Sequence, residues 1–584
     1  MIDLKTAPFN LSNEAIKWVE TTISGMTIEE KIGQLFIHFI EDEMTQQGQA
    51  HLKHLLDEYH IGGIRYASRN AEAIYEQNAF MQANSKLPLF VAANCDNGGD
   101  GACKGGTYIA TAAQAGATND EETAYHVGVV SGREAAAIGC NWSFNPVSDV
   151  IFNWRNTIVN TRSFGNQPSE VIKHAKAYIK GLRESGLAAC AKHFPGDGVE
   201  DRDQHLIMGV NDFSCERWDE TFGEVYGKLI EEGLQTIMVG HIALPEYSRK
   251  LVPGIADEDI KPATLAPELL QGLLREKLGF NGLLVTDASH MVGLVASASR
   301  KDLVPGTIAA GCDMFLFFRN PEEDFNYMLE GYKNGIITDE RLEEALTRIL
   351  GLKASLGLHK KQEAKALIPP KEGLKVIGQE EHLTWAKEAA DKGVTLVKDT
   401  QKLLPIDPKI RKRAKVFMLS TPPVSIAYEE DPAKKLVKEE LEAVGFSVDM
   451  HDSFYDLELQ YGASKESKEK IHHLCKIEDF KKQYDVVFVF VNVRGYAQEN
   501  NVRIKWSADH SNELPWYVQE VPTVCVSLNY TTHLFDLPMM KTYINAYAAN
   551  RTCIKTAIDK ITGKSPFLGK HNETVFCGKW DTRL

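Results

Sequence analysis

The sequence lacks the features that mark several classes of protein. Its ten cysteines form no C-x-x-C pair, and several lie inside apolar runs, so we expect neither a disulfide framework nor a zinc site. The 80 acidic residues outnumber the 65 basic ones, and no basic run with interleaved aromatic residues appears. This balance argues against a nucleic-acid partner. No stretch is long and apolar enough to cross a bilayer, so no membrane partner is expected either.

The amino terminus also lacks the apolar core and the cleavage site of a signal peptide. We therefore expect a cytoplasmic protein. No phosphate-binding glycine motif follows the predicted strands of the carboxyl-terminal part, so a nucleotide site there is unsupported. The sequence shows no cluster of metal ligands, and no cofactor is predicted.

The first two-thirds of the chain contain eight short apolar runs, separated by longer stretches with helical patterning. They start at Gly33, Ile61, Pro88, Cys140, Gly186, Gln235, Gly282 and Gly311. Strands that alternate with helices predict a parallel sheet with right-handed crossovers. Eight such units are the number that closes a (β/α)8 barrel of the TIM type.

The character of the sequence changes after about residue 365. The Ile-Pro-Pro-Lys segment at 368–371, which lies within a lysine-rich stretch, is typical of a linker. Five further apolar runs follow, starting at Ala414, Gly445, Tyr484, Pro522 and Lys541, and they predict a second, open α/β sheet. We therefore predict a catalytic barrel domain over residues 1–365 and a carboxyl-terminal α/β sandwich domain over residues 366–584.

Polar residues recur at the carboxyl ends of the predicted barrel strands. They are Arg65, Asp96, Asp149, Lys192 with His193, His241 and Asp287. In a barrel of this kind the active site lies at that rim. Any one of these residues is as readily explained by a structural ion pair, but their convergence on one rim favours a functional site.

Several motifs occur together and in a fixed order. They are MTIEEKIGQLF at 26–36, IGGIRY, KHFPGDG, the triplet Asp203-Gln204-His205, LGFNGLLVTDA and AGCDMFL. In this combination the chain resembles glycoside hydrolase family 3, and most of all its bacterial β-N-acetylglucosaminidase branch. The later block KGVTLVKDTQKLLPI, with INAYA and ITGKSPFLGK, resembles the sandwich domain that follows the barrel in many members. The resemblance implies the cleavage of glycosidic bonds.

Two groups carry that chemistry in a retaining enzyme, a carboxylate that attacks the anomeric carbon and a group that protonates the leaving oxygen. Asp287 follows four apolar residues and matches the family's nucleophile, although an aspartate there can also cap the next helix. The resemblance assigns the proton transfer to His205, oriented by Asp203. The alternative is that His205 is an exposed loop residue and that Glu200 or Asp201 transfers the proton.

The resemblance also implies a set of residues that hold the sugar, namely Asp96, Lys104, Arg162, Lys192 and His193. Charged donors and acceptors of this kind fix the geometry of sugar hydroxyls. Lys104 stands where the family commonly has an arginine, and Asp197 stands where KHFPGHG has a second histidine. Asp197 is also explained as a turn residue between two glycines. His241 lies on the same rim without an assigned role.

The sequence thus predicts a retaining exo-β-N-acetylglucosaminidase that acts on imported chitin or cell-wall fragments through a glycosyl-Asp287 intermediate. A phosphorylase of the same family is a near alternative, because a histidine acid/base repels phosphate less than a carboxylate does. A β-glucosidase of the family is the other, because the departures at Lys104 and Asp197 leave the sugar preference open. Two remoter alternatives are a lyase that forms a Schiff base on Lys192 and a sugar-binding protein without turnover. The carboxyl-terminal domain is expected to act as a scaffold or to support a homodimer.

Overall fold

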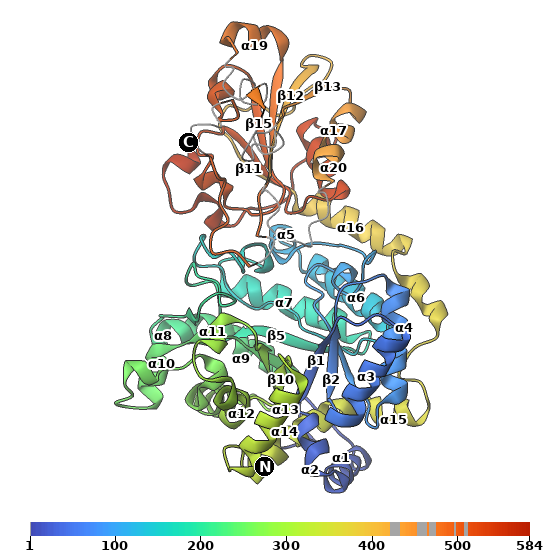
Figure 1. The fold of residues 1–584 in the computed structure, drawn as a ribbon. Coiled ribbons are helices and arrows are strands. Elements are labelled where there is room, and N and C mark those ends of the chain that lie inside the picture. The colour runs from blue at the N-terminus through green and yellow to red at the C-terminus, as the bar shows by residue number, and fades with distance from the viewer. Residues whose placement is uncertain (1, 421–431, 453–463, 466–474, 496–497, 507–511) are drawn as a thin grey trace. The chain divides into compact units, whose positions relative to one another are not determined.

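The computed structural model describes the chain except for residues 1, 421–431, 453–463, 466–474, 496–497 and 507–511. The chain divides into two compact units, which the colour gradient of Figure 1 helps to follow. The first comprises Met1–Ile109, Glu121–Ile151 and Gln167–Leu383, and the second comprises Ala110–Asp120, Phe152–Asn166 and Thr384–Leu584. The predicted linker at 368–371 falls in the first unit, and the boundary after residue 365 stays a prediction.

The first unit contains a closed barrel of eight parallel strands, which confirms the predicted fold class. The strands are β1 (Phe36–Ile40), β2 (Gly63–Tyr66), β3 (Phe90–Ala93), β4 (Trp142–Ser143), β5 (Ala188–Phe194), β7 (Thr236–Val239), β9 (Leu283–Ala288) and β10 (Met314–Leu316). Each lies within one of the eight predicted runs. Strands β6 (Gly209–Val210) and β8 (Ile242–Ala243) form a separate parallel pair beyond the ends of β5 and β7.

Helices connect the barrel strands and cover the outside of the barrel (Figure 1). The longer ones are α3 (Gln46–Tyr59), α4 (Ala71–Asn84), α6 (Glu121–Ala137), α7 (Pro168–Arg183), α9 (Glu224–Glu231), α12 (Arg300–Ala310), α13 (Pro321–Lys333) and α14 (Asp339–Ser355). The motif MTIEEKIGQLF begins helix α2 (Ile28–Gly33) with a capping box. Thr27 accepts from the backbone of Glu30, whose carboxylate accepts from the backbone of Thr27.

The second unit is built on a six-stranded sheet with helices on its faces, as predicted. Its order is β11 (Thr395–Asp399), β16 (Thr542–Asn545), β15 (Thr523–Ser527), β14 (Val486–Asn492), β12 (Arg413–Ser420) and β13 (Ser447–Met450). Helices α17 (Ala433–Ala443) and α20 (Arg551–Ile561) share one apolar core with the sheet. A second core lies around Phe480 of α19 (Ile477–Gln483). The edge strand β11, which pairs antiparallel with β16, was not among the predicted strands.

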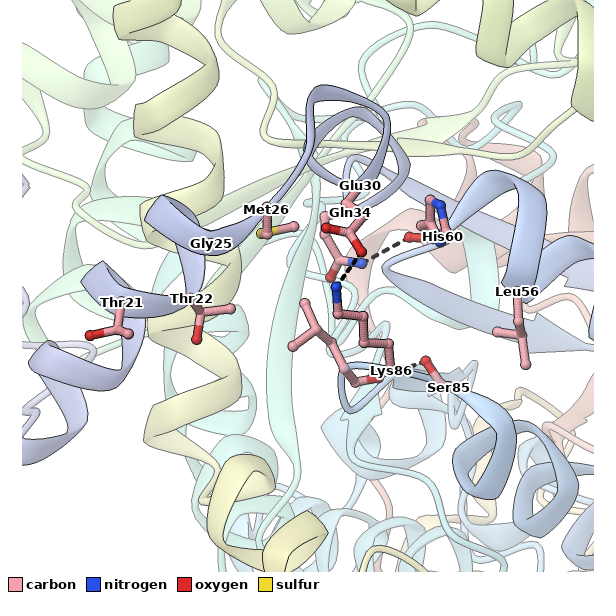
Figure 2. A pocket seen from close by; sticks show the side chains of 11 residues that line it. Thr21, Thr22, Gly25, Met26, Glu30, Gln34, Leu56, His60, Ser85 and Lys86 are labelled. Atoms are coloured by element: carbon pink, nitrogen blue, oxygen red, sulfur yellow. Dashed lines mark hydrogen bonds and ion pairs between the residues drawn. The ribbon is translucent and has the colours of Figure 1, made fainter.

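Two structural features occupy the amino-terminal end of the barrel strands, away from the rim. Asp313, in the motif AGCDMFL, is buried and forms ion pairs with three arginines, Arg275, Arg341 and Arg348. A pocket of about 210 Å³ is lined by Thr21, Thr22, Gly25, Met26, Glu30, Gln34, Leu56, His60, Ser85, Lys86 and Leu87 (Figure 2). Since Gln34, His60 and Leu87 precede strands β1 to β3, this pocket is separate from the rim residues.

No helix in the described part of the chain is long and apolar enough to span a membrane.

Candidate active site

Asp287 lies near the carboxyl end of β9, where the barrel interior opens at the rim. Its carboxylate oxygen Oδ2 is 3.9 Å from Nε2 of His193, and Oδ1 accepts from the backbone of Ala288 at 2.7 Å. Burial by itself raises the pKa of Asp287, but His193, His241 and His205 together lower it to about 2. The carboxylate is therefore ionised at neutral pH. The next helix, α11 (Val292–Val295), begins after Met291 without a side-chain cap, so Asp287 does not cap it.

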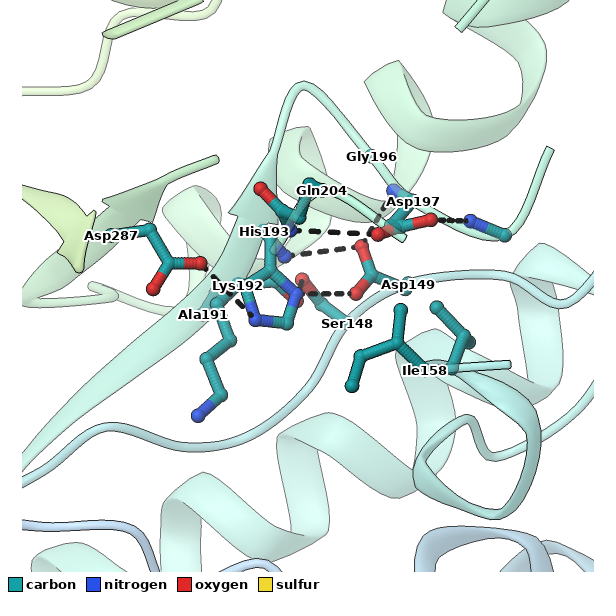
Figure 3. A network of polar contacts seen from close by, with 12 residues as sticks. Ser148, Asp149, Ile158, Ala191, Lys192, His193, Gly196, Asp197, Gln204 and Asp287 are labelled. Atoms are coloured by element: carbon teal, nitrogen blue, oxygen red, sulfur yellow. Dashed lines mark hydrogen bonds and ion pairs between the residues drawn. The ribbon is translucent and has the colours of Figure 1, made fainter. Parts of the chain in front are cut away.

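Asp149 fixes the ring of His193 (Figure 3). Nδ1 of His193 donates to Asp149 Oδ2 at 2.7 Å, and the backbone N–H groups of His193 and Asp197 donate to Oδ1 at 3.0 and 2.8 Å. All three groups are buried. Because Nδ1 is engaged by Asp149, Nε2 is the nitrogen directed to Asp287.

A cation and a carboxylate lie together at the ends of β3 and β5. Nζ of Lys192 is 3.9 Å from Asp96 Oδ1, and Asn145 donates from its side chain to the same oxygen. The Lys192 side chain is only 2% exposed, whereas that of Asp96 is 25% exposed. This arrangement presents a partly accessible carboxylate beside a buried cation, which suits the recognition of hydroxyl groups. Asn145, whose oxygen also accepts from the backbone of Cys95, was not predicted.

Asp203 and His205 form a contact within one short turn. Oδ1 of Asp203 accepts from both the backbone N–H and Nδ1 of His205, at 2.9 and 2.7 Å. Asp203 is buried, while the His205 side chain is 23% exposed, so Nε2 is the nitrogen that remains for a substrate. The two contacts with Asp203 fix the orientation of the His205 ring. Glu200, the alternative donor, accepts instead from Arg202 and from the backbone of Val210.

His241 is buried beside strand β9, which carries Asp287, and it forms a hydrogen bond with the backbone of that strand. Its Nε2–H donates to the carbonyl of Ala288 at 3.0 Å, and Nδ1 accepts from Thr264 Oγ1 at 3.1 Å. Burial lowers the pKa of His241 to about 4, so the ring is neutral at physiological pH. His241 therefore holds the residue after Asp287 in place, a role that the sequence did not reveal.

Lys104 and Arg162 are the two remaining predicted sugar ligands. Lys104 is exposed on the loop that follows the short helix η1 (Gly99–Gly101), and its backbone N–H donates to the carbonyl of Arg69 at 2.7 Å. Arg162 ends the short helix η2 (Asn160–Arg162), which belongs to the second unit. The first unit thus brings together Asp96, Lys192, His193, Asp203, His205 and Asp287 at the rim.

The comparisons with known proteins identify the family. The model of the glycosyl hydrolase family 3 N-terminal domain matches residues 27–352, more than half of the chain. The chain belongs to glycosyl hydrolase family 3. This family 3 enzyme is 39% identical, over the full length of both chains, to a protein of Cellulomonas fimi named β-N-acetylglucosaminidase/β-glucosidase. It is also 28% identical, over half of its own length and 82% of the relative's, to a β-hexosaminidase of Methylobacillus flagellatus.

Solved structures resemble the family 3 chain over both units. A structure described as β-glucoside phosphorylase BglX bound to 2FGlc is 38% identical and has a TM-score of 0.88. The match covers 97% of this chain and 98% of that one. The relatives agree on the family but differ in their named activities. Some names refer to N-acetylglucosaminides and others to glucosides, and one refers to phosphorolysis and not to hydrolysis.

Proposed function

We propose that the chain is a retaining exo-acting enzyme that removes terminal β-linked N-acetylglucosamine, and also glucose, from oligosaccharide fragments. The observation that carries the proposal is Asp287, a buried carboxylate at a barrel strand end whose pKa is lowered to about 2 by nearby histidines. Such a group is a ready nucleophile at neutral pH. The dual name of the Cellulomonas fimi relative supports both sugars.

The reaction has two steps. In the first, the Asp287 carboxylate forms a bond to the anomeric carbon, while the bond to the leaving oxygen breaks and His205 gives that oxygen a proton. In the second, His205 takes a proton from water, and the oxygen of that water displaces Asp287 from the sugar. The Asp203 carboxylate, 2.7 Å from Nδ1, holds the ring of His205 in one orientation through both steps.

Substrate contacts follow from the polar groups of the rim. Asp96 would accept hydrogen bonds from sugar hydroxyls, Lys192 would donate to them, and His193 would contact the sugar through Nε2. The roles of Lys104 and Arg162 are proposed on the resemblance to the family alone. The Schiff-base lyase and the sugar-binding protein without turnover gain no support from the comparisons.

The first test compares 4-nitrophenyl β-N-acetylglucosaminide with the matching β-glucoside, using the native chain and Asp287→Asn. We expect turnover of the acetamido sugar by the native chain with retention of the anomeric configuration, followed by NMR, and loss of turnover in the variant. An inverted product, or a variant that keeps native activity, would contradict the proposed nucleophile. Turnover of the glucoside but not of the N-acetylglucosaminide would contradict the proposed N-acetylglucosaminidase activity.

Phosphate in place of water is a second candidate for the acceptor. Two observations favour it: the β-glucoside phosphorylase structure matches nearly the whole chain, and the group placed to assist the second step is an imidazole. An imidazole repels a phosphate dianion less than a carboxylate does. Formation of a sugar 1-phosphate in phosphate buffer would support the phosphorylase, and free sugar as the sole product would support hydrolysis.

A further inference from the structure

Gln204 lies between Asp203 and His205 in the sequence, and we call these two residues the dyad. The Gln204 side chain is buried, whereas that of His205 is partly exposed. Its Nε2 donates to Asp197 Oδ2 at 3.5 Å, and its Oε1 accepts from the backbone N–H of His241 at 2.7 Å. The amide therefore connects the turn that carries His205 to the segments that follow strands β5 and β7. We call residues 203–207 the dyad turn.

The backbone of the dyad turn is held as well. The N–H groups of Val292 and Gly293 donate to the carbonyls of His205 and Gln204 at 2.9 and 3.2 Å. A Cβ atom on Gly293 would lie 2.6 Å from the Gln204 oxygen and 3.1 Å from the oxygen of Ile207. The segment that follows the nucleophile strand thus packs directly on the dyad turn, at a distance that requires glycine.

The same contacts reach the histidine that faces the nucleophile. Asp149 accepts from His193 and also from the backbone of Asp197, and Asp197 accepts in turn from Gln204. Figure 3 shows this network of polar contacts beside Asp287. The pairing of the Asp197 carboxylate with the Gln204 amide therefore joins the dyad turn to the histidine that faces Asp287.

We propose that Gln204 is a positioning residue. Through Asp197, His241 and Gly293 it holds the dyad turn where His205 can protonate the leaving oxygen. The inference rests on the proposed function of His205. Proton transfer requires the donor within hydrogen-bond reach of the leaving atom, so a shift of the turn weakens acid assistance while Asp287 keeps its own contacts.

The leaving group of the substrate separates this role from a general loss of structure. The 2,4-dinitrophenolate group leaves without being protonated, whereas the leaving oxygen of a phenyl glycoside needs a proton. Gln204→Met keeps the length of the side chain and removes both hydrogen bonds. We expect it to lower kcat/KM for the phenyl glycoside by about tenfold or more and for the dinitrophenyl glycoside by less than about twofold, with His205→Ala setting a limit of about 10²–10⁴-fold.

Matched variants control for stability. Gln82 is also buried, and its amide makes two hydrogen bonds of 3.0 Å with the backbone of Leu89, at the amino-terminal end of the barrel. Gln82→Met should therefore show no dependence on the leaving group. Gly293→Ala is the second test variant, and Gly227→Ala, whose Cβ meets nothing within 4 Å, is its control.

A charge-conserving exchange tests the contact with Asp197. Gln204→Glu alone places two carboxylates together and should weaken acid assistance. In the double variant Asp197→Asn with Gln204→Glu, the new amide at 197 can donate to the new carboxylate at 204. That carboxylate can still accept from the backbone N–H of His241, so activity on the phenyl glycoside should recover. A double variant no better than Gln204→Glu would contradict the contact.

Equal losses on the two glycosides in Gln204→Met and Gly293→Ala would overturn the positioning role, and so would a leaving-group-dependent loss in Gln82→Met. If His205→Ala itself loses no more activity on the phenyl than on the dinitrophenyl glycoside, the proposed function of His205 fails. The two failures are thus distinguishable in one series of measurements.

Discussion

Lys353 provides a test of how the barrel is stabilised. This residue of α14 is fully buried, with Nζ 2.7 Å from Gln34 Oε1 and 5.1 Å from the centre of the Phe90 ring. Desolvation lowers the pKa of Lys353 from 10.5 to about 7. The folded protein therefore keeps an amine that loses its proton far more readily than a lysine in water does.

The sign of the pH dependence follows from proton binding. Between about pH 7 and the ordinary lysine pKa, the unfolded chain binds more protons at this residue than the folded one, so its contribution to stability rises with pH. At 1.36 kcal/mol for each pKa unit, the cost of burying the charged amine at low pH is about 5 kcal/mol. Lys353→Met removes this cost but leaves Gln34 Oε1 without its donor, which costs about 1–3 kcal/mol.

We therefore expect Lys353→Met to be more stable than the parent by about 2–4 kcal/mol at pH 6, and less stable by about 1–3 kcal/mol above pH 10.5. Urea unfolding of both proteins over this range measures the difference, in which all other titrating groups cancel. Lys560→Met is the control, since the buried Nζ of Lys560 donates to Asp391 Oδ1 at 3.0 Å, and we expect its loss to lower the free energy of unfolding at pH 6, where Lys353→Met raises it. A difference for Lys353→Met that stays constant with pH would refute the reasoning.

Three further predictions concern the ion cluster and the rim. Asp313→Asn leaves three buried arginines without their carboxylate and should lower the free energy of unfolding by about 3–5 kcal/mol, measured by urea unfolding. Asp149→Asn loosens His193 and should lower kcat/KM by about 10²-fold on phenyl and dinitrophenyl glycosides alike; a loss confined to the phenyl glycoside would contradict this. Because the pKa of Asp287 is lowered to about 2, its carboxylate stays ionised as pH falls. Activity on the dinitrophenyl glycoside should therefore persist to about pH 4, and a decline in kcat/KM there that follows protonation of Asp287 would count against the prediction.

The barrel could be predicted because each of its strands is a short apolar run beside a helical stretch. Strand β11 could not, because two of its five residues are charged and only one edge of it pairs with the sheet. Residues 110–120 and 152–166 join the second unit although they lie between barrel elements. Apolar patterning shows that a segment is buried, but it does not show which core the segment enters.

The site was predicted in part from strand ends and in part from the family resemblance. Strand ends alone placed Asp96, Lys192 and Asp287 at one rim. Two of the supporting contacts could not be predicted, because they join groups far apart in sequence. Gln204 contacts His241, and Asp149 contacts His193, each across about 40 residues of sequence. Hydrophobic periodicity does not predict contacts at such a separation.

The most direct measurement of the central claim is to trap the intermediate with 2,4-dinitrophenyl 2-deoxy-2-fluoro-β-glucoside and to locate the sugar by mass spectrometry of peptides. We expect one fluorosugar per chain, bound as an ester to Asp287, and none in Asp287→Asn. A sugar attached to another residue, or rapid turnover with an inverted anomeric product and no trapped ester, would contradict the account.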